Sequence, residues 1–365
     1  MNRIFLSSLI AVGVLGGCVA DELGDEATSS TEQFAKCPEW GCGENSPVTG
    51  PYNVRELYFL DSNVGNGSHV RLLAFQKNIN GTVVNYQVSV VKDQVKALYW
   101  GTNTVALEHQ ALKDGWFLLY HDAVDGYPAE PIYLRIMSVD NQPYWQPPST
   151  AYIETYELGY TGAGRTGDPA PVCNKPLRSS GIRDTAIDPA EGKQWKNRFH
   201  SIIYTGDRIG DSYTVTSGAR ASGWLNIACA GSVTAKLHLN RHTAASAVPG
   251  VVTTTTAQRQ TMLKMYAGDF CGSGNAYTVA GTPIHWNSAT GLNSGSGNDT
   301  AFESMWSAQG AMCMQTHRLA SSTVTTESEM GTDVFHECQL PKCENFPDYK
   351  NYTLYSQYLM TLSPQ

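Results

Sequence analysis

The sequence lacks an excess of positive charge and the short motifs that mark the commonest phosphate-binding and hydrolytic sites. It contains 25 Lys and Arg residues against 33 Asp and Glu residues, so a nucleic-acid partner or an anionic membrane surface is disfavoured. No serine stands in a Gly-x-Ser-x-Gly elbow. The glycines around Cys271 and from Gly291 to Gly297 lack the Lys and the Ser or Thr of a phosphate-binding loop. Serine hydrolase and nucleotide-binding chemistry find no support, and no cofactor is expected.

The apolar run at the N-terminus is too short to span a bilayer. Arg3 precedes an apolar segment over residues 4–14, and Leu15-Gly16-Gly17-Cys18 closes it. A spanning helix takes about 20 residues, whereas this layout is that of a secretory signal. A branched apolar residue, two small residues and a cysteine form a lipobox, so we expect residues 1–17 to be removed and Cys18 to carry lipid. The alternatives are an ordinary signal peptide with a chance cysteine and a buried N-terminal helix.

A flexible tether is expected after the lipobox. Residues 19–35 include five acidic residues and several small polar ones, with no basic residue, and such a composition buries too little surface to fold. We therefore interpret residues 18–36 as a tether that links the body to a membrane through the acylated Cys18. Val19 is not the aspartate that retains enteric lipoproteins at the inner membrane, which favours the outer membrane or cell surface.

Cysteine usage agrees with export. Eight cysteines remain after Cys18, and an even set in an oxidising compartment predicts four disulfides. Their spacing favours two local bridges, Cys37–Cys42 and Cys338–Cys343, with zinc binding as the disfavoured alternative. Eight cysteines allow 105 pairings. The eight candidates are Cys37, Cys42, Cys173, Cys229, Cys271, Cys313, Cys338 and Cys343.

The residue pattern predicts a β-rich α+β fold in two parts. Residues 37–160 contain short runs rich in Val, Ile, Leu and Tyr, separated by turn residues, and predict an antiparallel domain, sandwich or barrel-like. Asn80-Gly81 between two alternating runs is the clearest hairpin signal. Residues 161–176, rich in Gly and Pro, are expected to be a linker. The predicted strands are residues 54–61, 68–76, 82–92, 116–121, 132–139 and 152–158.

The second part, residues 177–345, is expected to mix short strands with a helical pair, and residues 346–365 to form a C-terminal strand or tail. Helices are predicted over residues 230–242 and 257–267, although neither periodicity is strong. If the two helices form an antiparallel hairpin, Cys229 lies near Cys271, which leaves Cys173 with Cys313. The predicted strands are residues 200–204, 213–216, 224–229, 302–306 and 311–314.

Several stretches resemble one family. Gly268-Asp269-Phe270-Cys271-Gly272 is similar to the Ala-Asp-Tyr-Cys-Gly signature of the ADYC domain, found in predicted lipoproteins and secreted proteins of myxobacteria and relatives. The resemblance implies export but no catalytic residue, because the family is a domain of unknown function. The run from Leu237 to Ala247 departs from an aromatic stretch common in the family, so its disulfide arrangement does not carry over there. Residues 37–47, 227–231, 235–236, 281–284 and 310–313 also match in the expected order.

Four residues offer a weak catalytic set. Cys271 with His285 could act as a thiol nucleophile and its base, and the alternative is a disulfide at Cys271. Asp269 could be a general base or a metal ligand, and the alternative is a turn cap. His200 completes the set. A secreted hydrolase built on these residues is therefore the second hypothesis for function.

Two histidines and six tryptophans have competing interpretations. His238 and His242, four apart on the first predicted helix, could share a metal, but no third ligand is spaced nearby and we expect surface histidines; no metal is predicted. Exposed aromatic rings beside polar loops could bind a sugar or peptide, and the alternative is a place in the core. The tryptophans are Trp100, Trp116, Trp145, Trp195, Trp286 and Trp306.

The favoured hypothesis is a non-catalytic binding or structural module at the cell surface. Its expected partners are the membrane, reached through the lipid anchor, and an extracellular polysaccharide or protein.

Overall fold

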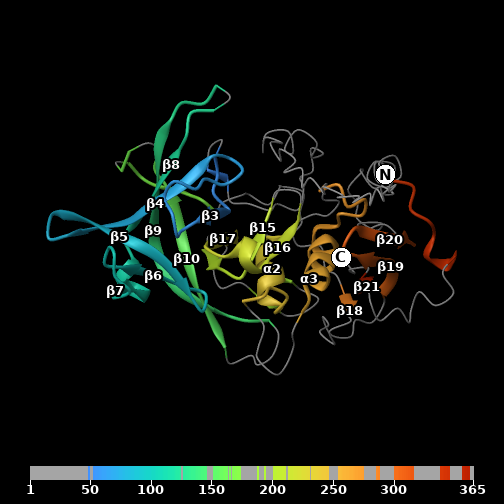
Figure 1. Ribbon diagram of the computed structural model, residues 1–365. Helices are drawn as coiled ribbons and strands as arrows, with labels where there is room; N and C mark the ends of the chain where they lie inside the picture. Colours follow the sequence, from blue (N-terminus) through green and yellow to red (C-terminus); the bar gives the residue numbers. More distant parts are fainter. Residues whose placement is uncertain are drawn as a thin grey trace, which may run out of the picture.

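The described part of the molecule has a large β sheet at one end, a small sheet at the other and two α-helices between them (Figure 1). The computed structural model therefore has the β-rich fold predicted from the sequence. It describes residues 48–49, 52–173, 187–188, 193–194, 200–245, 254–274, 285–287, 300–315, 338–345 and 356–361, apart from positions 125, 146–150, 163, 166, 211–212 and 231.

The large sheet has eleven strands. Ten follow one another in the order β3-β17-β14-β10-β9-β8-β4-β5-β6-β7, and β11 adds to β10. The strands in chain order are β3 Glu56–Tyr58, β4 Val70–Ile79, β5 Thr82–Val91, β6 Gln94–Leu98, β7 Val105–Glu108, β8 Trp116–His121, β9 Glu130–Pro143, β10 Tyr152–Tyr160, β11 Ala170–Pro171, β14 His200–Tyr204 and β17 Trp224–Cys229.

The turn signal at residues 80–81 is correct. Asn80 and Gly81 have φ values of 52° and 85°, and they join β4 to β5 in the hairpin whose last pair is Ile79 with Thr82. Positive φ at both central residues is the geometry that matches the twist of the flanking strands, and Asn-Gly adopts it readily.

The two strands that end the large sheet after β5 were not predicted. β6 and β7 extend the sheet beyond β5, and the 3-10 helix η1 (His109–Leu112) follows them. In β6 the side chains of Val95 and Ala97 are fully buried, while the residues that alternate with them are partly exposed. This alternation is short and contains a lysine, which is why it did not stand out as a strand.

The sheet continues across the expected linker. β14 and β17, which follow the linker, pair with β10 and with each other, and β17 also pairs with β3. Within the expected linker, β11 pairs with β10, and Cys173 forms a disulfide with Cys229. Residues before and after positions 161–176 are thus joined by one sheet and one covalent bond.

The sheet curves enough to enclose its own core. Leu57 of the edge strand β3 and Ala97 of β6, near the other edge, belong to the same cluster of buried apolar side chains. A second core covers the outer side of β10 and β14, where Ile153 and Ile202 pack with the helices. Every residue of β14 is buried, because Ile203 faces the first core and its neighbours face the second.

Two α-helices pack on this outer side. α2 (Val233–Leu239) is shorter than predicted and begins at Ser232, whose hydroxyl accepts from the Ala235 amide. α3 (Thr256–Ala267) begins with a capping box between Thr255 and Gln258. Such a box satisfies amides that the first turn of a helix leaves unpaired.

The small sheet completes the second core. It contains β18 (His285–Asn287), β19 (Thr300–Ser307), β20 (Gly310–Met314) and β21 (Ser356–Thr361), in the order β18-β21-β19-β20. Residues 356–361 are thus the strand expected in the C-terminal segment. The shorter elements are three two-stranded pairs and two 3-10 helices: β1 (Val48–Thr49) with β2 (Tyr52–Asn53), β12 (Ile187–Asp188) with β13 (Lys193–Gln194), β15 (Asp207–Ile209) with β16 (Val215–Ser217), and the helices η2 (Gly218–Ala221) and η3 (Cys343–Asn345).

Three disulfides join cysteines of the described residues, and the pairings predicted for these six cysteines were wrong. The bridges are Cys173–Cys229, Cys271–Cys338 and Cys313–Cys343, so the predicted Cys229–Cys271, Cys173–Cys313 and local Cys338–Cys343 bridges do not form. The helical-pair argument failed because Cys229 ends β17 inside the sheet, and its partner comes from the segment beside β10. Cys18, Cys37 and Cys42 lie outside the described residues.

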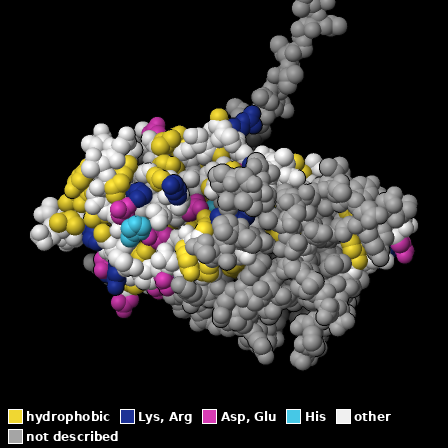
Figure 2. Space-filling model, turned by 90° about the horizontal axis from the view of Figure 1, so that it is seen from below, with side chains coloured by type: hydrophobic (Ala, Val, Ile, Leu, Met, Phe, Trp, Pro, Cys, Tyr) yellow, Lys and Arg dark blue, Asp and Glu magenta, His cyan; other side chains and the backbone are white. Residues whose placement is uncertain are grey.

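The surface carries mixed charge. On the face in Figure 2, Lys and Arg side chains alternate with Asp and Glu among apolar side chains, as expected for acidic residues spread along the sequence. Within the described residues, no helix combines the length and apolar character needed to cross a bilayer.

Candidate functional site

The most exposed large apolar side chain of the described residues is Trp100, with 61 % of its surface accessible. It stands in the turn between β6 and β7, where Gly101 has a φ of 72°. The Tyr99 amide donates to the Thr104 carbonyl at 3.1 Å, and the Thr102 amide donates to the Tyr99 carbonyl at 3.0 Å. These bonds fix the backbone of the turn that carries the exposed indole ring.

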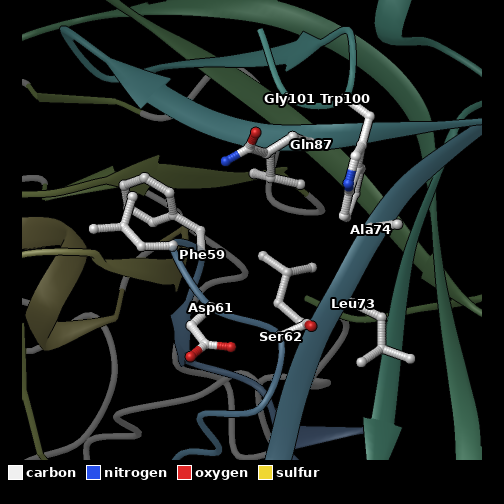
Figure 3. Close-up of a pocket in the computed structure, with 11 residues that line it drawn as sticks. Phe59, Asp61, Ser62, Leu73, Ala74, Gln87, Trp100 and Gly101 are labelled. Carbon is white, nitrogen blue, oxygen red and sulfur yellow. The ribbon is translucent and has the colours of Figure 1, made fainter. Parts of the chain in front are cut away.

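A cavity lies beside this ring. We call it the Trp100 pocket; it is half open to solvent, has a volume of about 240 Å³ and is drawn in Figure 3. Its walls come from the segment after β3, from β4 and β5, and from the β6–β7 turn, so four separate stretches of chain build it. The lining residues are Phe59, Leu60, Asp61, Ser62, Leu72, Leu73, Ala74, Gln87, Val88, Trp100 and Gly101.

The pocket combines an apolar body with three polar side chains. Asp61, Ser62 and Gln87 supply a carboxylate, a hydroxyl and an amide (Figure 3). No Lys, Arg or His belongs to the lining, so Asp61 is its one charged residue. A mostly apolar cavity with a few polar groups is the usual make-up of a small-molecule site.

The polar wall is held in place by hydrogen bonds. Asp61 Oδ1 accepts from the Asn63 backbone amide at 2.9 Å and from its side-chain amide at 3.0 Å. Arg71 Nη1 donates to the Ser62 carbonyl at 3.2 Å, while the same guanidinium pairs with Asp122 at 2.6 Å. A wall fixed before the ligand arrives lowers the entropic cost of binding.

The signature segment lies elsewhere, at the end of α3. Gly268 ends the helix with a φ of 67°, and Asp269 is fully buried and pairs with Lys264 Nζ at 2.5 Å. Asp269 Oδ2 also accepts from the Gly274 amide at 3.0 Å. The carboxylate therefore holds the loop that follows the helix.

The other signature residues contact the small sheet. The Phe270 ring lies 4.8 Å from that of Trp306, and Cys271 is bonded to Cys338. At Gly272 a Cβ atom would lie 1.8 Å from the carbonyl oxygen of Gln309, and φ is 73°, so only glycine fits. Each residue from 268 to 272 thus has a packing or cross-linking contact.

His200 is buried in a chain of hydrogen bonds. Ser138 Oγ donates to Glu157 at 2.8 Å, so its oxygen must accept from His200 Nε2 at 3.0 Å. His200 Nδ1 then accepts from the Thr155 hydroxyl at 2.8 Å. Burial lowers the pKa of His200, which agrees with a neutral imidazole held between two strands.

His238 and His242 are fully buried, so the expectation of two surface histidines was wrong. α2 ends at Leu239, before His242, whose ring packs edge-on against Trp286 at 5.1 Å. The hydrophobic residues of α2 lie against the sheet, and they carry His238 into the interior with them. No group of three His, Cys, Asp or Glu able to hold a metal occurs in the described residues.

His238 belongs to a polar cluster that connects α2 to the β5–β6 turn. His238 Nε2 lies 3.1 Å from Asp93 Oδ2, and its Nδ1 lies 2.6 Å from Thr243 Oγ1. The Tyr144 hydroxyl also donates to Asp93, and the Tyr204 ring stacks on the imidazole at 4.0 Å. Asp93 belongs to the β5–β6 turn, so this cluster fastens the hairpin to α2.

The described side chains of the catalytic candidates do not form a catalytic set. Cys271 and Asp269 are engaged at the end of α3, His200 lies in the large sheet, and His285 is the first residue of β18, where it pairs with Leu359. Nothing is described of the His285 side chain.

The six tryptophans have different environments. Trp286 and Trp306 are buried and pack in the second core, Trp116 and Trp145 are partly exposed, and Trp195 lies outside the described residues. Of the five that the structure describes, Trp100 is the one that is highly exposed, and it lies beside a cavity. No sequence pattern pointed to Asp61, Ser62 or Gln87, because the pocket depends on which strands pair.

Comparison with known proteins gives one relationship. Neither the curated protein sequences nor the solved structures contain a match to this chain. The family model of the ADYC domain matches residues 132–320, a range that begins in β9 and includes the signature, both helices and β20. Since this match covers more than half of the sequence, the chain belongs to the ADYC domain family.

Proposed function

We propose that the chain is an exported, lipid-anchored binding module that holds an extracellular polysaccharide or protein in the Trp100 pocket. The observation that carries this proposal is the pocket itself, a cavity beside an exposed indole ring on a hydrogen-bonded turn. The pocket lies outside residues 132–320, the range matched by the ADYC model.

The sequence supports the anchor. Leu15-Gly16-Gly17-Cys18 is a lipobox, and residues 18–36 would carry the body away from an outer membrane or cell surface. Three disulfides among the described residues suit an oxidising compartment. The lipid would hold the protein at the membrane, and the pocket would face outward.

The second hypothesis, a secreted hydrolase around Cys271, Asp269 and His285, has less support. The sulfur of Cys271 is bonded to Cys338, and Asp269 is fully buried. A thiolate nucleophile needs a free and accessible sulfur.

The anchor is tested by expressing the full-length chain in Gram-negative cells fed a labelled fatty acid. We expect label on the wild-type protein and in the outer-membrane fraction, and loss of both in Cys18→Ser. Label on the Cys18→Ser variant, or wild-type protein found soluble, contradicts the anchor.

Binding is tested with the detergent-solubilised full-length protein on beads exposed to extracellular matrix from the producing bacterium. Trp100→Ala should lose the captured polysaccharide or protein, and the matched control Tyr152→Ala should retain it. Tyr152 is 59 % exposed and lies on β10, away from the lining residues. Equal capture by both variants contradicts a role for the pocket.

A further inference from the structure

The chemistry of the Trp100 pocket restricts the ligand that it takes. The exposed indole of Trp100 offers a flat apolar face at the rim, and an aromatic ring of this kind binds surfaces that are apolar on one side and polar at the edge. The C–H face of a pyranose has this character, since its hydroxyl groups point outward around the ring. The indole and the sugar ring can therefore stack.

The three polar side chains suit hydroxyl groups. A sugar hydroxyl both donates and accepts, so Asp61 can accept from one, while Gln87 and Ser62 can donate to or accept from others. In Figure 3 these side chains and the Trp100 ring border the same space. One sugar can therefore stack and hydrogen-bond at once.

Charge selects among sugars. An acidic sugar would meet Asp61 with no cation in the lining to offset the repulsion, and the whole chain carries a formal charge of −8. Like charges brought together in this way reject a ligand. Phosphorylated and uronic sugars should therefore bind more weakly than neutral ones.

Size selects the number of sugar units. The cavity encloses about 240 Å³, below the range of about 300–1,000 Å³ that holds a drug-sized molecule. A protein partner would need a contact of about 800 Å² on each side, and the cavity offers room for only one small group.

We infer that the Trp100 pocket takes one uncharged pyranose unit of an extracellular polysaccharide, stacked on the Trp100 indole and hydrogen-bonded by Asp61, Ser62 and Gln87. This inference rests on the proposed binding function and names its ligand. The remaining units of the polysaccharide extend along the surface.

Isothermal titration of the full-length solubilised protein tests the inference. The probes are the neutral hexasaccharides of cellulose, laminarin and starch, with hexagalacturonate as the acidic probe. We expect at least one neutral probe to bind and hexagalacturonate to bind at least about tenfold more weakly. Tighter binding of hexagalacturonate, or no binding of any neutral probe at millimolar concentration, overturns the inference.

Variants locate the binding and separate it from folding. Trp100→Ala should weaken the neutral probe at least about tenfold, whereas Trp100→Phe keeps a ring and should bind within about threefold of wild type. Gln87→Ala should weaken it as well, Asp61→Asn should reduce the discrimination against hexagalacturonate, and Tyr152→Ala should change nothing. Full binding by Trp100→Ala overturns the site.

The two proposals fail in different ways. If no hexasaccharide binds but extracellular protein is still captured through Trp100, the sugar inference is wrong and the binding module stands. If Trp100→Ala captures everything that wild type captures, both are wrong.

Discussion

The large sheet and the region of α3 with the small sheet are stabilised by different interactions. The sheet encloses a core of apolar side chains from nine of its strands, and Phe75, Phe117 and Leu134 are among the most deeply buried. Around α3 and the small sheet, two disulfides and two buried ion pairs supplement the second core. The large sheet has one disulfide of its own, Cys173–Cys229, so the second region differs in having more cross-links around a smaller sheet.

The buried ion pairs show how the second region is assembled. Arg259 of α3 binds Asp207 of β15 through two nitrogens, at 2.9 and 3.0 Å, and the Ala244 amide donates to the same carboxylate at 2.8 Å. Such a pair fixes one arrangement of the groups around it, and losing either partner leaves a buried charge. Polar contacts therefore determine how α3 sits against the sheet.

The largest expected effect comes from removing a cross-link. In the double variant Cys271→Ser with Cys338→Ser, the free energy of unfolding should fall by about 4 kcal/mol, because the bridge closes a long loop. Hydrogen exchange should quicken in β19 and β20 more than in β8 and β9. Equal loss of protection in both sheets would remove the distinction between the regions.

Breaking the ion pair of the signature should cost slightly less. Lys264→Met leaves the buried carboxylate of Asp269 uncompensated and should lower the free energy of unfolding by about 3 kcal/mol, measured by urea denaturation. Lys96→Met, at a partly exposed pair with Glu108, is the control and should change little. Similar losses of unfolding free energy in both variants would contradict a larger contribution from the buried pair.

Acid should weaken the contact that Asp93 of the β5–β6 turn makes with His238 of α2. Burial alone would raise the pKa of Asp93, but His238, Tyr144 and Arg241 outweigh it and hold that pKa below its ordinary value. A carboxyl with a lowered folded-state pKa stabilises the protein above its unfolded pKa of about 3.9, and the contribution is lost as the pH falls below it. Stability measured from pH 6 to pH 2.5 should therefore fall more steeply in wild type than in Asp93→Asn. Parallel curves would show that Asp93 does not contribute.

The smallest effect is expected at the pocket. Trp100 is largely exposed, so Trp100→Ala should change the free energy of unfolding by less than about 0.5 kcal/mol, while Phe117→Ala in the first core should cost about 3–5 kcal/mol. Thermal denaturation of both variants measures this. A large loss from Trp100→Ala would make the ring a structural residue and would weaken the binding proposal.

Local signals in the sequence predicted local structure well. Asn80-Gly81 gave its hairpin, and the second helix was found within one residue of its start, because turns and caps depend on neighbouring residues. The first helix was predicted at the correct position, but the predicted range, residues 230–242, is longer than α2. These features need no knowledge of distant parts of the chain.

Features that depend on distant residues were not predictable. Cys229 could be paired only by knowing that β17 lies inside the sheet, and His238 could be placed only by knowing that the outer face of that sheet is covered. The Trp100 pocket was not predictable for the same reason, since one of its walls is the turn between β6 and β7, which were not predicted. Trp100 was named as one of six tryptophans, but nothing distinguished it from the buried ones.

The pairing of β3 with β17 has a consequence for the time course of folding. Glu56 lies opposite Asn226, so an early segment completes its hydrogen bonds only after a much later one has emerged. Contacts between residues so far apart form slowly, and an unpaired strand edge can meanwhile join another chain. If the chain is exported as proposed, this edge stays unpaired while the chain crosses the membrane from its N-terminus, and we expect crowded expression to yield aggregates that contain β3.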